Sequence, residues 1–318
     1  MRLLRRLDAR DLEGPGGQGP GHVAAIGSFD GIHRGHRVLF DRVIAAADQQ
    51  GLSSLVITFE PLPREFFSPA DPPARLTSFR DRWRLLEKGG PRQLCVLRFN
   101  ESLRALTPVQ FASRLTGAGV QRLVIGHDFR AARGGEATAA WFAQEGPRLG
   151  LQVDVVDPVL ERGERVSSSA VRQALAGGDL EKARMLLGRR YSIWGRVMAG
   201  QQLGRTLGFP TANLRLGRRR SPMDGIFAVR VRGVGNGHPP QASLAGVASL
   251  GTRPTVGGTE PLLEAHVFDF EGDLYGREIE VEFVARLRDE VKFDSVPALV
   301  EQMHRDAAEA RAVLARTQ

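Results

Sequence analysis

The first half of the chain alternates short apolar runs with segments of helical periodicity. The runs are rich in Val, Ile and Leu and lie at 23–27, 54–59, 94–99, 122–126 and 151–156. The helical segments between them lie at 36–48, 78–88, 108–116 and 137–146. Continuous apolar strands separated by helices indicate parallel βαβ units. We therefore predict an α/β fold whose ligands bind at the carboxyl ends of the strands.

The second half has a different pattern, in which apolar and polar residues alternate one by one. Two short helices are predicted at 169–176 and 179–187, and the change comes directly after them. Strict alternation then predicts strands at 226–232 and 278–284. Residues 267–276 are predicted to form a strand that ends in a Gly/Asp turn, and a last helix begins near 295. Short alternating strands with Gly and Pro turns are typical of an antiparallel sandwich or barrel. We therefore predict two domains, residues 1–187 and 188–318.

Composition and charge narrow the classes of partner. The 318 residues include one cysteine, Cys95, so neither an intrachain disulfide nor a Cys-based zinc site is expected, and we interpret Cys95 as a core residue. The net charge of +8 favours anionic partners without choosing among them. The N-terminal segment lacks the apolar run of a secretory signal, and no segment has the length of a membrane span. The expected compartment is the cytoplasm, with no membrane partner.

The stretch "GSFDGIHRGH", residues 27–36, follows the first predicted strand. Its glycines allow a sharp turn, and the helix that follows presents free N–H groups and a dipole that attract phosphate. His33 and His36 are three residues apart, so they share one side of the first helical turn. Two imidazoles beside a phosphate can stabilise the charge that develops in nucleotidyl transfer. The alternative is two surface histidines at a helix start.

Several segments together resemble one protein family. "GSFDGIHRGHR", "TFEPLPREFF", "IGHDFR" and "VSSSAVRQALAGGDLEKARMLLGRRY" occur in the order seen in prokaryotic bifunctional riboflavin kinase/FAD synthetases. "GRVMAGQQLGRTLGFPTANL", "SLGTRPTVGG" and "LLEAHVFDF" resemble the riboflavin kinase half of that family. The resemblance covers nearly the whole chain. It implies an N-terminal Rossmann-like nucleotidyltransferase domain and a C-terminal six-stranded antiparallel barrel, the flavokinase domain, with a C-terminal helix.

The resemblance also implies roles for residues of the first half. His33 and His36 would hold the ATP phosphates and the developing pyrophosphate, with Arg172 as a further catalytic residue. Ser168 and Ser169 would bind phosphate beside Arg172, which agrees with hydroxyls at a helix N-terminus followed by an arginine. A simple serine N-cap with a solvated arginine is the alternative. The remaining nucleotide-binding residues implied are Gly27, Phe29, Asp30 and Gly35.

The flavin pocket of the first half would be walled by residues that follow two later strands. The resemblance implies Pro61, Phe66, Asp128 and Phe129 there, with Phe67 beside Phe66. From the sequence alone, Pro61, Phe66 and Phe67 are more consistent with plain core residues. The sequence departs from the family pattern after Asp128, since "DFRAARGGEA" stands where "DFRFGKGRxG" is usual. This departure motivates an alternative function, a riboflavin kinase whose N-terminal half has lost adenylyl transfer.

The second predicted site lies in "GRVMAGQQLGRTLGFPTANL", residues 195–214. Thr211 and Asn213 are two residues apart, so in an extended segment their oxygens point the same way and suit Mg²⁺. A turn or Asx motif is an equal alternative. By resemblance, Thr211 and Asn213 bind Mg²⁺-ATP with Gly204, Thr255 contacts the flavin, and Glu264 is the general base. We expect Glu264 to face inward on its strand and to share a face with His266; a solvated outer-face residue is the alternative.

The resemblance implies two reactions, with Mg²⁺ in each site. Riboflavin and ATP give FMN, and FMN and ATP then give FAD and pyrophosphate; both are in-line transfers at phosphorus. Two other classes remain as alternatives. A nucleic-acid-binding protein is motivated by the net charge, although "LGRRR" at 216–220 is the one dense basic cluster. A flavin-binding regulator without catalysis is the other. We predict no nucleic-acid partner and leave weak self-association open.

Overall fold

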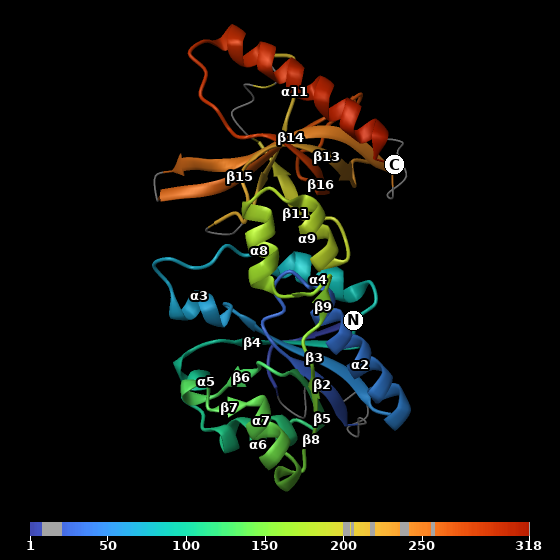
Figure 1. Ribbon diagram of the computed structural model, residues 1–318, viewed down its shortest axis with the longest axis vertical. Helices are drawn as coiled ribbons and strands as arrows, with labels where there is room; N and C mark the ends of the chain where they lie inside the picture. Colours follow the sequence, from blue (N-terminus) through green and yellow to red (C-terminus); the bar gives the residue numbers. More distant parts are fainter. Residues whose placement is uncertain are drawn as a thin grey trace. The chain divides into compact units, whose positions relative to one another are not determined.

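The computed structural model describes residues 1–7, 21–199, 204, 207–216, 220–235, 242–255 and 258–317, without the side chains of 253–255 and 258–260 (Figure 1). Most of the arginine cluster at 216–220 therefore lies outside the described residues. The chain divides into two compact units. The first comprises Met1–Pro73 and Arg82–Val166, and the second comprises Ala74–Asp81 and Ser167–Gln318. The functional boundary at residue 187 stays a prediction.

The first unit is built on a parallel sheet of six strands among the described residues, with the order β1-β4-β3-β2-β5-β8. The strands are β1 (Arg2–Leu4), β2 (His22–Ile26), β3 (Ser53–Glu60), β4 (Gln93–Arg98), β5 (Val120–Gly126) and β8 (Gln152–Val156). All five predicted strands are present, and the parallel α/β fold is confirmed. β1 was not predicted, because three residues flanked by arginines carry no readable period.

Helices cover both faces of this sheet. The helices are α2 (Arg34–Gln50), α3 (Pro63–Phe67), α4 (Phe79–Glu87), α5 (Glu101–Arg104), α6 (Pro108–Gly117) and α7 (Ala139–Glu145). One core cluster joins side chains of α6 and α7 to one face of the strands. α2 contacts β2, β3 and β5 with its own buried stripe, Phe40, Val43, Ala46 and Ala47. Cys95 is fully buried in β4, as interpreted from the sequence.

Short elements complete the first unit. Two hairpins pair β6 (Arg130–Ala131) with β7 (Ala137–Thr138) and β9 (Leu160–Glu161) with β10 (Glu164–Arg165), and 3-10 turns lie at Arg133–Gly135 and Pro147–Leu149. The strand order reverses beside β2. From β2 the chain continues through β3 to β4 on one side, and then returns to place β5 and β8 on the other. In open parallel sheets ligands bind outside the carboxyl ends of the strands at such a reversal.

The second unit contains a closed antiparallel barrel in the order β11-β12-β15-β14-β13-β16. Its strands are β11 (Ser192–Met198), β12 (Ala212–Arg215), β13 (Gly225–Arg232), β14 (Ser243–Thr255), β15 (Gly258–Val267) and β16 (Glu278–Arg288). The six-stranded barrel is thus confirmed. The alternation seen in "EIEVEFV" has its expected cause, since Ile279, Val281 and Phe283 are buried in the barrel core.

Three helices accompany the barrel among the described residues of the second unit: α8 (Ser168–Ala176), α9 (Leu180–Leu187) and α11 (Val296–Arg316). α11 begins as predicted, because the Ser295 side chain accepts a hydrogen bond from the Ala298 N–H. Its apolar stripe packs on the outer face of β13, β14 and β16 through a cluster that includes Phe268, Ala310 and Leu314. α11 therefore covers part of the outer surface of the barrel.

One predicted strand is wrong. Residues 267–276 are predicted to form a strand that ends in a Gly/Asp turn, but β15 already ends at Val267 and a turn follows at once. Asp269 adopts a positive φ of 54°, which a strand excludes. The Phe268 N–H donates to the Ala245 carbonyl, and its side chain packs under α11 instead of continuing the barrel wall. The apolar residues that suggested a strand therefore serve the helix contact.

Candidate active sites

The loop after β2 is tightly turned and buried. Phe29, Gly31 and Ile32 all have positive φ, at 47°, 86° and 41°. For Phe29 and Ile32 this conformation is costly, and such local strain is found where a surrounding structure fixes a functional loop. Asp30 is 2% exposed and lies within this turn. The sharp turn predicted for residues 27–31 is present, and Gly31 is its glycine with a positive φ.

His33 and His36 lie face to face at the start of α2. Their ring centroids are 3.6 Å apart with 19° between the planes. His33 is the N-cap residue, and its Nδ1 accepts from the His36 N–H at 3.3 Å. The edge of Phe29 meets the His36 ring at 5.1 Å between centroids. The two imidazoles are thus held as one stacked pair at a helix N-terminus, where an anion is favoured.

Two predicted glycines leave room for this pair. A Cβ on Gly35 would come within 3.2 Å of the His33 ring, and a Cβ on Gly27 would come within 3.0 Å of the Phe29 ring. Both distances are tighter than ordinary van der Waals contact. The absence of a side chain at Gly35 therefore leaves room for the His33 ring in its stack. The absence of a side chain at Gly27 leaves room for the Phe29 ring, which contacts His36. The sequence pattern predicted both positions but not these two reasons.

A buried arginine that the sequence did not reveal supports the same loop. Arg82 of α4 is 1% exposed. Its Nη1 donates to the Ser28 carbonyl at 3.1 Å and to the Thr58 hydroxyl at 3.1 Å, and its Nη2 donates to the Glu60 carboxylate at 2.5 Å. One guanidinium thereby joins the loop after β2 to the end of β3. The planar fork of arginine suits this simultaneous binding.

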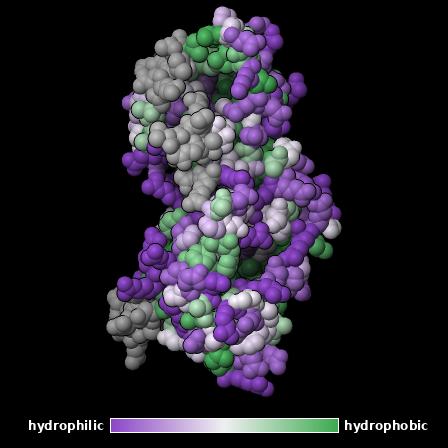
Figure 2. All heavy atoms as spheres, turned by 90° about the vertical axis from the view of Figure 1, so that its left-hand side faces the viewer, coloured by the Kyte–Doolittle hydropathy of each residue, from purple (hydrophilic) through white to green (hydrophobic). Residues whose placement is uncertain are grey.

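An aromatic cluster follows β3. Phe66 and Phe67 of α3 each contact Phe99, with ring centroids 5.2 Å and 5.7 Å apart. No residue of α3 is buried, and Phe67 is 58% exposed. Pro61 is also exposed. Figure 2 looks onto this side of the molecule and shows hydrophobic side chains at the surface. These residues are therefore not the plain core that the sequence left as an alternative.

Asp128 and Phe129 follow β5, on the other side of the strand-order reversal from β3. Asp128 is exposed and accepts a hydrogen bond from Arg165 Nη2 at 2.6 Å. Phe129 is half-buried, and its ring lies 6.0 Å from that of Phe142, against the core. The loops after β2, β3 and β5 therefore all carry predicted site residues at one edge of the sheet.

The predicted phosphate-binding group on α8 belongs to the second unit. Ser167 is the N-cap residue, and its side chain accepts from the Ala170 N–H. Ser168 and Ser169 are the first two helical residues, and Arg172 Nε donates to the Ala74 carbonyl at 2.5 Å. Serine capping is thus done by the residue before the predicted pair.

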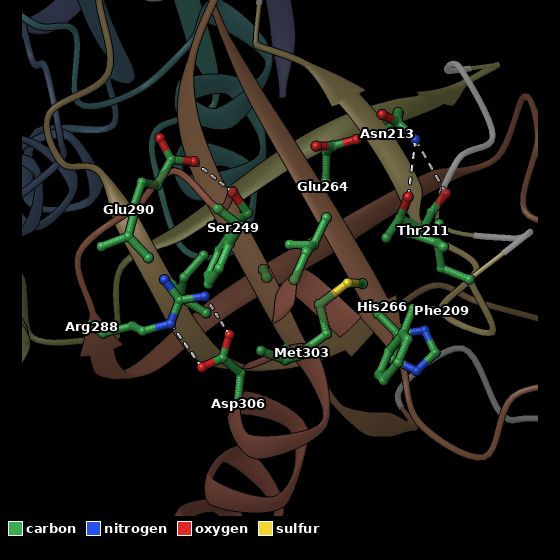
Figure 3. A pocket seen from close by; sticks show the side chains of 18 of the residues that line it. Phe209, Thr211, Asn213, Ser249, Glu264, His266, Arg288, Glu290, Met303 and Asp306 are labelled. Atoms are coloured by element: carbon green, nitrogen blue, oxygen red, sulfur yellow. Dashed lines mark hydrogen bonds and ion pairs between the residues drawn. The ribbon is translucent and has the colours of Figure 1, made fainter. Parts of the chain in front are cut away.

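The barrel carries a cavity of about 600 Å³ (Figure 3). Gly204, Thr211, Asn213 and Glu264, predicted from distant parts of the sequence, all line it. Asn213 lies directly opposite Glu264 in the β12–β15 pairing. The Asn213 amide donates to the carbonyl and hydroxyl oxygens of Thr211 at 3.2 Å and 3.4 Å. The side chain of Thr255 lies outside the described residues, so its predicted flavin contact stays a prediction.

The predicted orientation of Glu264 needs a correction. Its neighbours Leu263 and Ala265 are buried in the barrel core, whereas Glu264 and His266 lie half-buried on the opposite face of β15. A lone carboxylate in the apolar interior would be costly, so the aliphatic residues occupy that face. Glu264 is not a fully solvated residue either, because this outer face is a wall of the cavity. The prediction that Glu264 and His266 share a face is confirmed.

Further polar residues of this cavity were missed by the sequence analysis. His266 Nδ1 donates to the Pro210 carbonyl at 2.8 Å, directly before Thr211. Arg288 forms a bidentate ion pair with the buried Asp306 of α11, at 2.8 Å and 2.6 Å. The Ser249 hydroxyl donates to Glu290 at 2.8 Å. The helical spacing of apolar residues along α11 predicts that one side of this helix is buried. It does not tell which strands α11 packs against, and so it could not place Asp306 beside Arg288.

Comparisons with known proteins find a different family match in each half of the chain. A family described as riboflavin kinase matches residues 187–314, and one described as FAD synthetase matches residues 18–170. A bifunctional riboflavin kinase/FMN adenylyltransferase of Pseudomonas fluorescens is 43% identical over 298 residues, covering 93% of this chain and 94% of the relative. The protein of the same description from Escherichia coli K12 is 42% identical over 293 residues, covering 92% of each chain.

A solved structure extends this likeness to the fold. A crystal structure described as a macrolide-efflux protein from Streptococcus pneumoniae is 30% identical, with a TM-score of 0.78, and covers 96% of this chain and 97% of its own. In the part of the chain that the structure describes, none of the helices combines the length and apolarity that crossing a membrane requires.

Fold, sites and relatives together define an enzyme class, the nucleotide-dependent transferases of phosphorus groups, with two such domains in one chain. The predicted alternatives of a non-catalytic flavin regulator and of a nucleic-acid-binding protein do not account for both matches. The chain belongs to the family of bifunctional riboflavin kinases/FMN adenylyltransferases.

Proposed function

We propose that the barrel phosphorylates riboflavin with ATP and that the parallel-sheet unit adenylylates the resulting FMN to give FAD and pyrophosphate. Family membership supports both activities over a kinase that has lost adenylyl transfer, because the FAD synthetase match spans residues 18–170 and so includes the departure at 131–133. The functional domains proposed are residues 1–187 and 188–318. The observation that carries the proposal is that the stacked pair His33–His36 lies in one compact unit, while the cavity lined by Thr211, Asn213 and Glu264 lies in the other.

In the barrel, Glu264 acts as the general base. The riboflavin 5′-hydroxyl donates its proton to the Glu264 carboxylate as the hydroxyl oxygen attacks the γ-phosphorus of ATP, and the bond from that phosphorus to the leaving ADP breaks. The position of Glu264 supports this role, because it lies in the wall of the cavity, opposite Asn213. A carboxylate within hydrogen-bond reach of the attacking hydroxyl lowers the barrier by removing the proton as the new bond forms. Gly204 and Thr255 complete the proposed ATP and flavin contacts.

The cavity residues fit a magnesium ion held mainly by ATP. Thr211 and Asn213 offer a hydroxyl and an amide oxygen, both hard ligands, and the Asn213 amide nitrogen faces Thr211, which leaves its oxygen on the other side. Among the described residues no group of three His, Cys, Asp or Glu side chains forms a protein-only metal site. A bound Mg²⁺ would neutralise phosphate charge, as it does when shared between protein and nucleotide. Thr211 and Asn213 would orient the phosphates for attack.

In the parallel-sheet unit, His33 and His36 contact the phosphates of a second ATP. The attacking group is the phosphate of FMN, which bonds to the α-phosphorus while the bond to pyrophosphate breaks. Negative charge grows on the leaving pyrophosphate, and imidazole N–H groups at a helix N-terminus stabilise that charge. Gly27, Phe29, Asp30 and Gly35 shape the loop, and Pro61, Phe66, Asp128 and Phe129 receive the flavin. The proposed role of Ser168, Ser169 and Arg172, on α8 of the second compact unit, is to bind phosphate.

The test separates the two activities in one chain. Purified protein is incubated with Mg²⁺, ATP and either riboflavin or FMN, and the flavins are resolved by chromatography. We expect His36→Ala to accumulate FMN from riboflavin without FAD. We expect Glu264→Gln to leave riboflavin unchanged while converting added FMN to FAD. Wild-type protein that makes FMN and never FAD would contradict the bifunctional assignment.

A further inference from the structure

A second pocket lies in the first unit, and none of the residues assigned above lines it. It has a volume of about 240 Å³. Its lining comes from the ends of β1 and β4, from α5 and from α6. The residues are Arg5, Arg6, Leu97, Arg98, Asn100, Ser102, Leu103 and Arg114. We name it the arginine pocket. None of the residues predicted to bind nucleotide or flavin lines it.

Strand pairing brings its arginines together from distant parts of the sequence. β1 pairs in parallel with β4, with Leu4 opposite Cys95. Arg5 and Arg6, which follow β1, therefore lie beside the last residues of β4, where Arg98 stands. The Cys95 thiol donates to the Arg6 carbonyl at 3.4 Å, which fixes this backbone beside β4. Arg114 comes from α6, a separate element.

Three of the four arginines of this pocket have no ion-pair partner among the described residues. Arg6, Arg98 and Arg114 form no ion pair with another described residue, and none of the lining residues is acidic. The nearby Glu101 and Arg104 neutralise each other at 2.6 Å and do not line the pocket. Gathering like charges is unfavourable unless an anion is bound, and guanidinium groups are the preferred partners of phosphate oxygens.

Asn100 presents a further donor. Its side-chain oxygen accepts from the Leu103 N–H at 2.9 Å and from the Ser102 hydroxyl at 2.8 Å. Both bonds engage the oxygen, so the amide orientation is fixed and the NH₂ group is left for a ligand. The polar lining thus consists almost entirely of hydrogen-bond donors. An acceptor-rich ligand with several negative charges matches it.

We propose that the arginine pocket binds a small phosphate anion, orthophosphate or pyrophosphate. Its volume is below the roughly 300–1,000 Å³ of pockets that enclose larger organic ligands, so a whole nucleotide does not suit it. The anion accepts hydrogen bonds from the guanidinium groups and from the Asn100 amide. This site goes beyond the proposed function, since neither reaction uses its residues. If the proposed reactions fail in solution, anion binding here is unaffected.

The test is calorimetric titration of the full chain with sodium pyrophosphate and, separately, sodium phosphate, at matched ionic strength. The variants are Arg98→Gln and Arg114→Gln. The control is Arg42→Gln, because Arg42 is exposed on α2 and has no ion pair among the described residues. We expect each pocket variant to weaken one binding event by about tenfold or more, as loss of a charge-assisted hydrogen bond should. Any pyrophosphate that binds at His33 and His36 gives the same heat in the pocket variants and in Arg42→Gln. The difference between their isotherms therefore reports the arginine pocket alone.

The two anions distinguish the source of the ligand. Tighter pyrophosphate binding indicates a site that takes up the product of adenylyl transfer, and equal binding indicates a site for free phosphate; either result supports the proposal. Isotherms of Arg98→Gln and Arg114→Gln that match Arg42→Gln overturn it, as does the absence of any binding heat in wild type.

Thermal melts give a second, independent measurement. In an anion-free buffer, Arg114→Gln should melt at the wild-type temperature or above it, because one of several like charges is gone. In pyrophosphate the wild type should gain more stability than Arg114→Gln, since a ligand stabilises only the folded state that binds it. A clear loss of stability in anion-free buffer would show that the chain itself already neutralises Arg114, and would overturn the proposal.

Discussion

Asn213 and Glu264 are directly opposite each other in the pairing of β12 with β15, and both line the barrel cavity. One belongs to the segment proposed to hold Mg²⁺-ATP and the other is the proposed base. Strand register therefore fixes the separation between the phosphate-binding side chain and the proton acceptor. Because register in a closed barrel is set by the whole ring of strands, this geometry is rigid before substrates bind.

Glu264→Gln should lower the rate of FMN formation by about 10²–10⁴-fold, since general-base catalysis contributes that much. Glutamine keeps the size of the side chain but cannot accept the proton. The KM for ATP should change little, because Glu264 is not proposed to bind it. Glu290→Gln is the matched control in the same cavity, where Glu290 accepts a hydrogen bond from Ser249. Equal losses in the two variants, measured as kcat by chromatography of FMN, would contradict the assignment.

Gly35→Ala should lower FAD formation while leaving FMN formation unchanged. The added methyl group would stand 3.2 Å from the His33 ring, so the ring must shift by a few tenths of an ångström relative to His36. A misplacement of catalytic groups by a fraction of an ångström to 1 Å costs on the order of ten- to hundredfold in rate. Gly117→Ala is the control, because its methyl group would meet nothing within 4 Å at the end of α6. FAD formation in Gly35→Ala at the rate of the control would refute the role of the stack.

Much of the fold could be predicted because its signals are local. The five long strands of the parallel sheet have continuous apolar runs, and β16 has a clean alternation. The N-cap at Ser295 also has a readable signature. The glycine and histidine spacing at residues 27–36 likewise predicted a turn into a helix. In each case a few neighbouring residues determine the conformation.

The rest depended on contacts between distant segments. Arg82 stands in an ordinary amphipathic helix pattern, and no local signal shows that its guanidinium is buried against Ser28. The face of Glu264 was predicted wrongly, because alternation tells which residues share a face but not which face is the core. Leu263 and Ala265 take the core face of β15, so Glu264 lies on the outer face, where residues of α11 also line the cavity.

His266 is a positioning residue for the ATP-binding segment, and its replacement should separate binding from chemistry. Its Nδ1 donates to the Pro210 carbonyl at 2.8 Å, directly before Thr211. His266→Leu should raise the KM for ATP in FMN formation by about three- to tenfold, as loss of one hydrogen bond would, with a smaller effect on kcat. His266→Asn should recover most of the affinity, because its amide nitrogen lies where Nδ1 lies. A kcat loss without a KM change, or no rescue by asparagine, would contradict this role.

His22 should make the first unit less stable as the pH falls. It lies in β2, 3% exposed, and burial lowers the pKa of its imidazole below the ordinary 6.5, although a hydrogen bond with the Ser53 backbone partly opposes this. Between the lowered folded pKa and 6.5 the unfolded chain binds more protons than the folded one, so the free energy of unfolding rises with pH. The contribution of His22 to the free energy of unfolding is complete above the pKa of the unfolded chain. It is lost as the pH falls through the lower pKa of the folded protein. For one group the slope cannot exceed about 1.4 kcal/mol per pH unit.

Urea denaturation of wild type and His22→Gln between about pH 8 and about pH 5 measures this contribution as the difference between the two curves. Other groups titrate in the same range, but they are common to both proteins and cancel in the difference. Glutamine is polar and stays neutral, so the variant should lose stability less steeply on acidification, and the two curves should converge from high to low pH. Parallel curves would show that His22 takes up its proton equally well in the folded and unfolded chain. In that event burial in β2 would not disfavour the charged ring, and the acid sensitivity of the first unit would have to arise elsewhere.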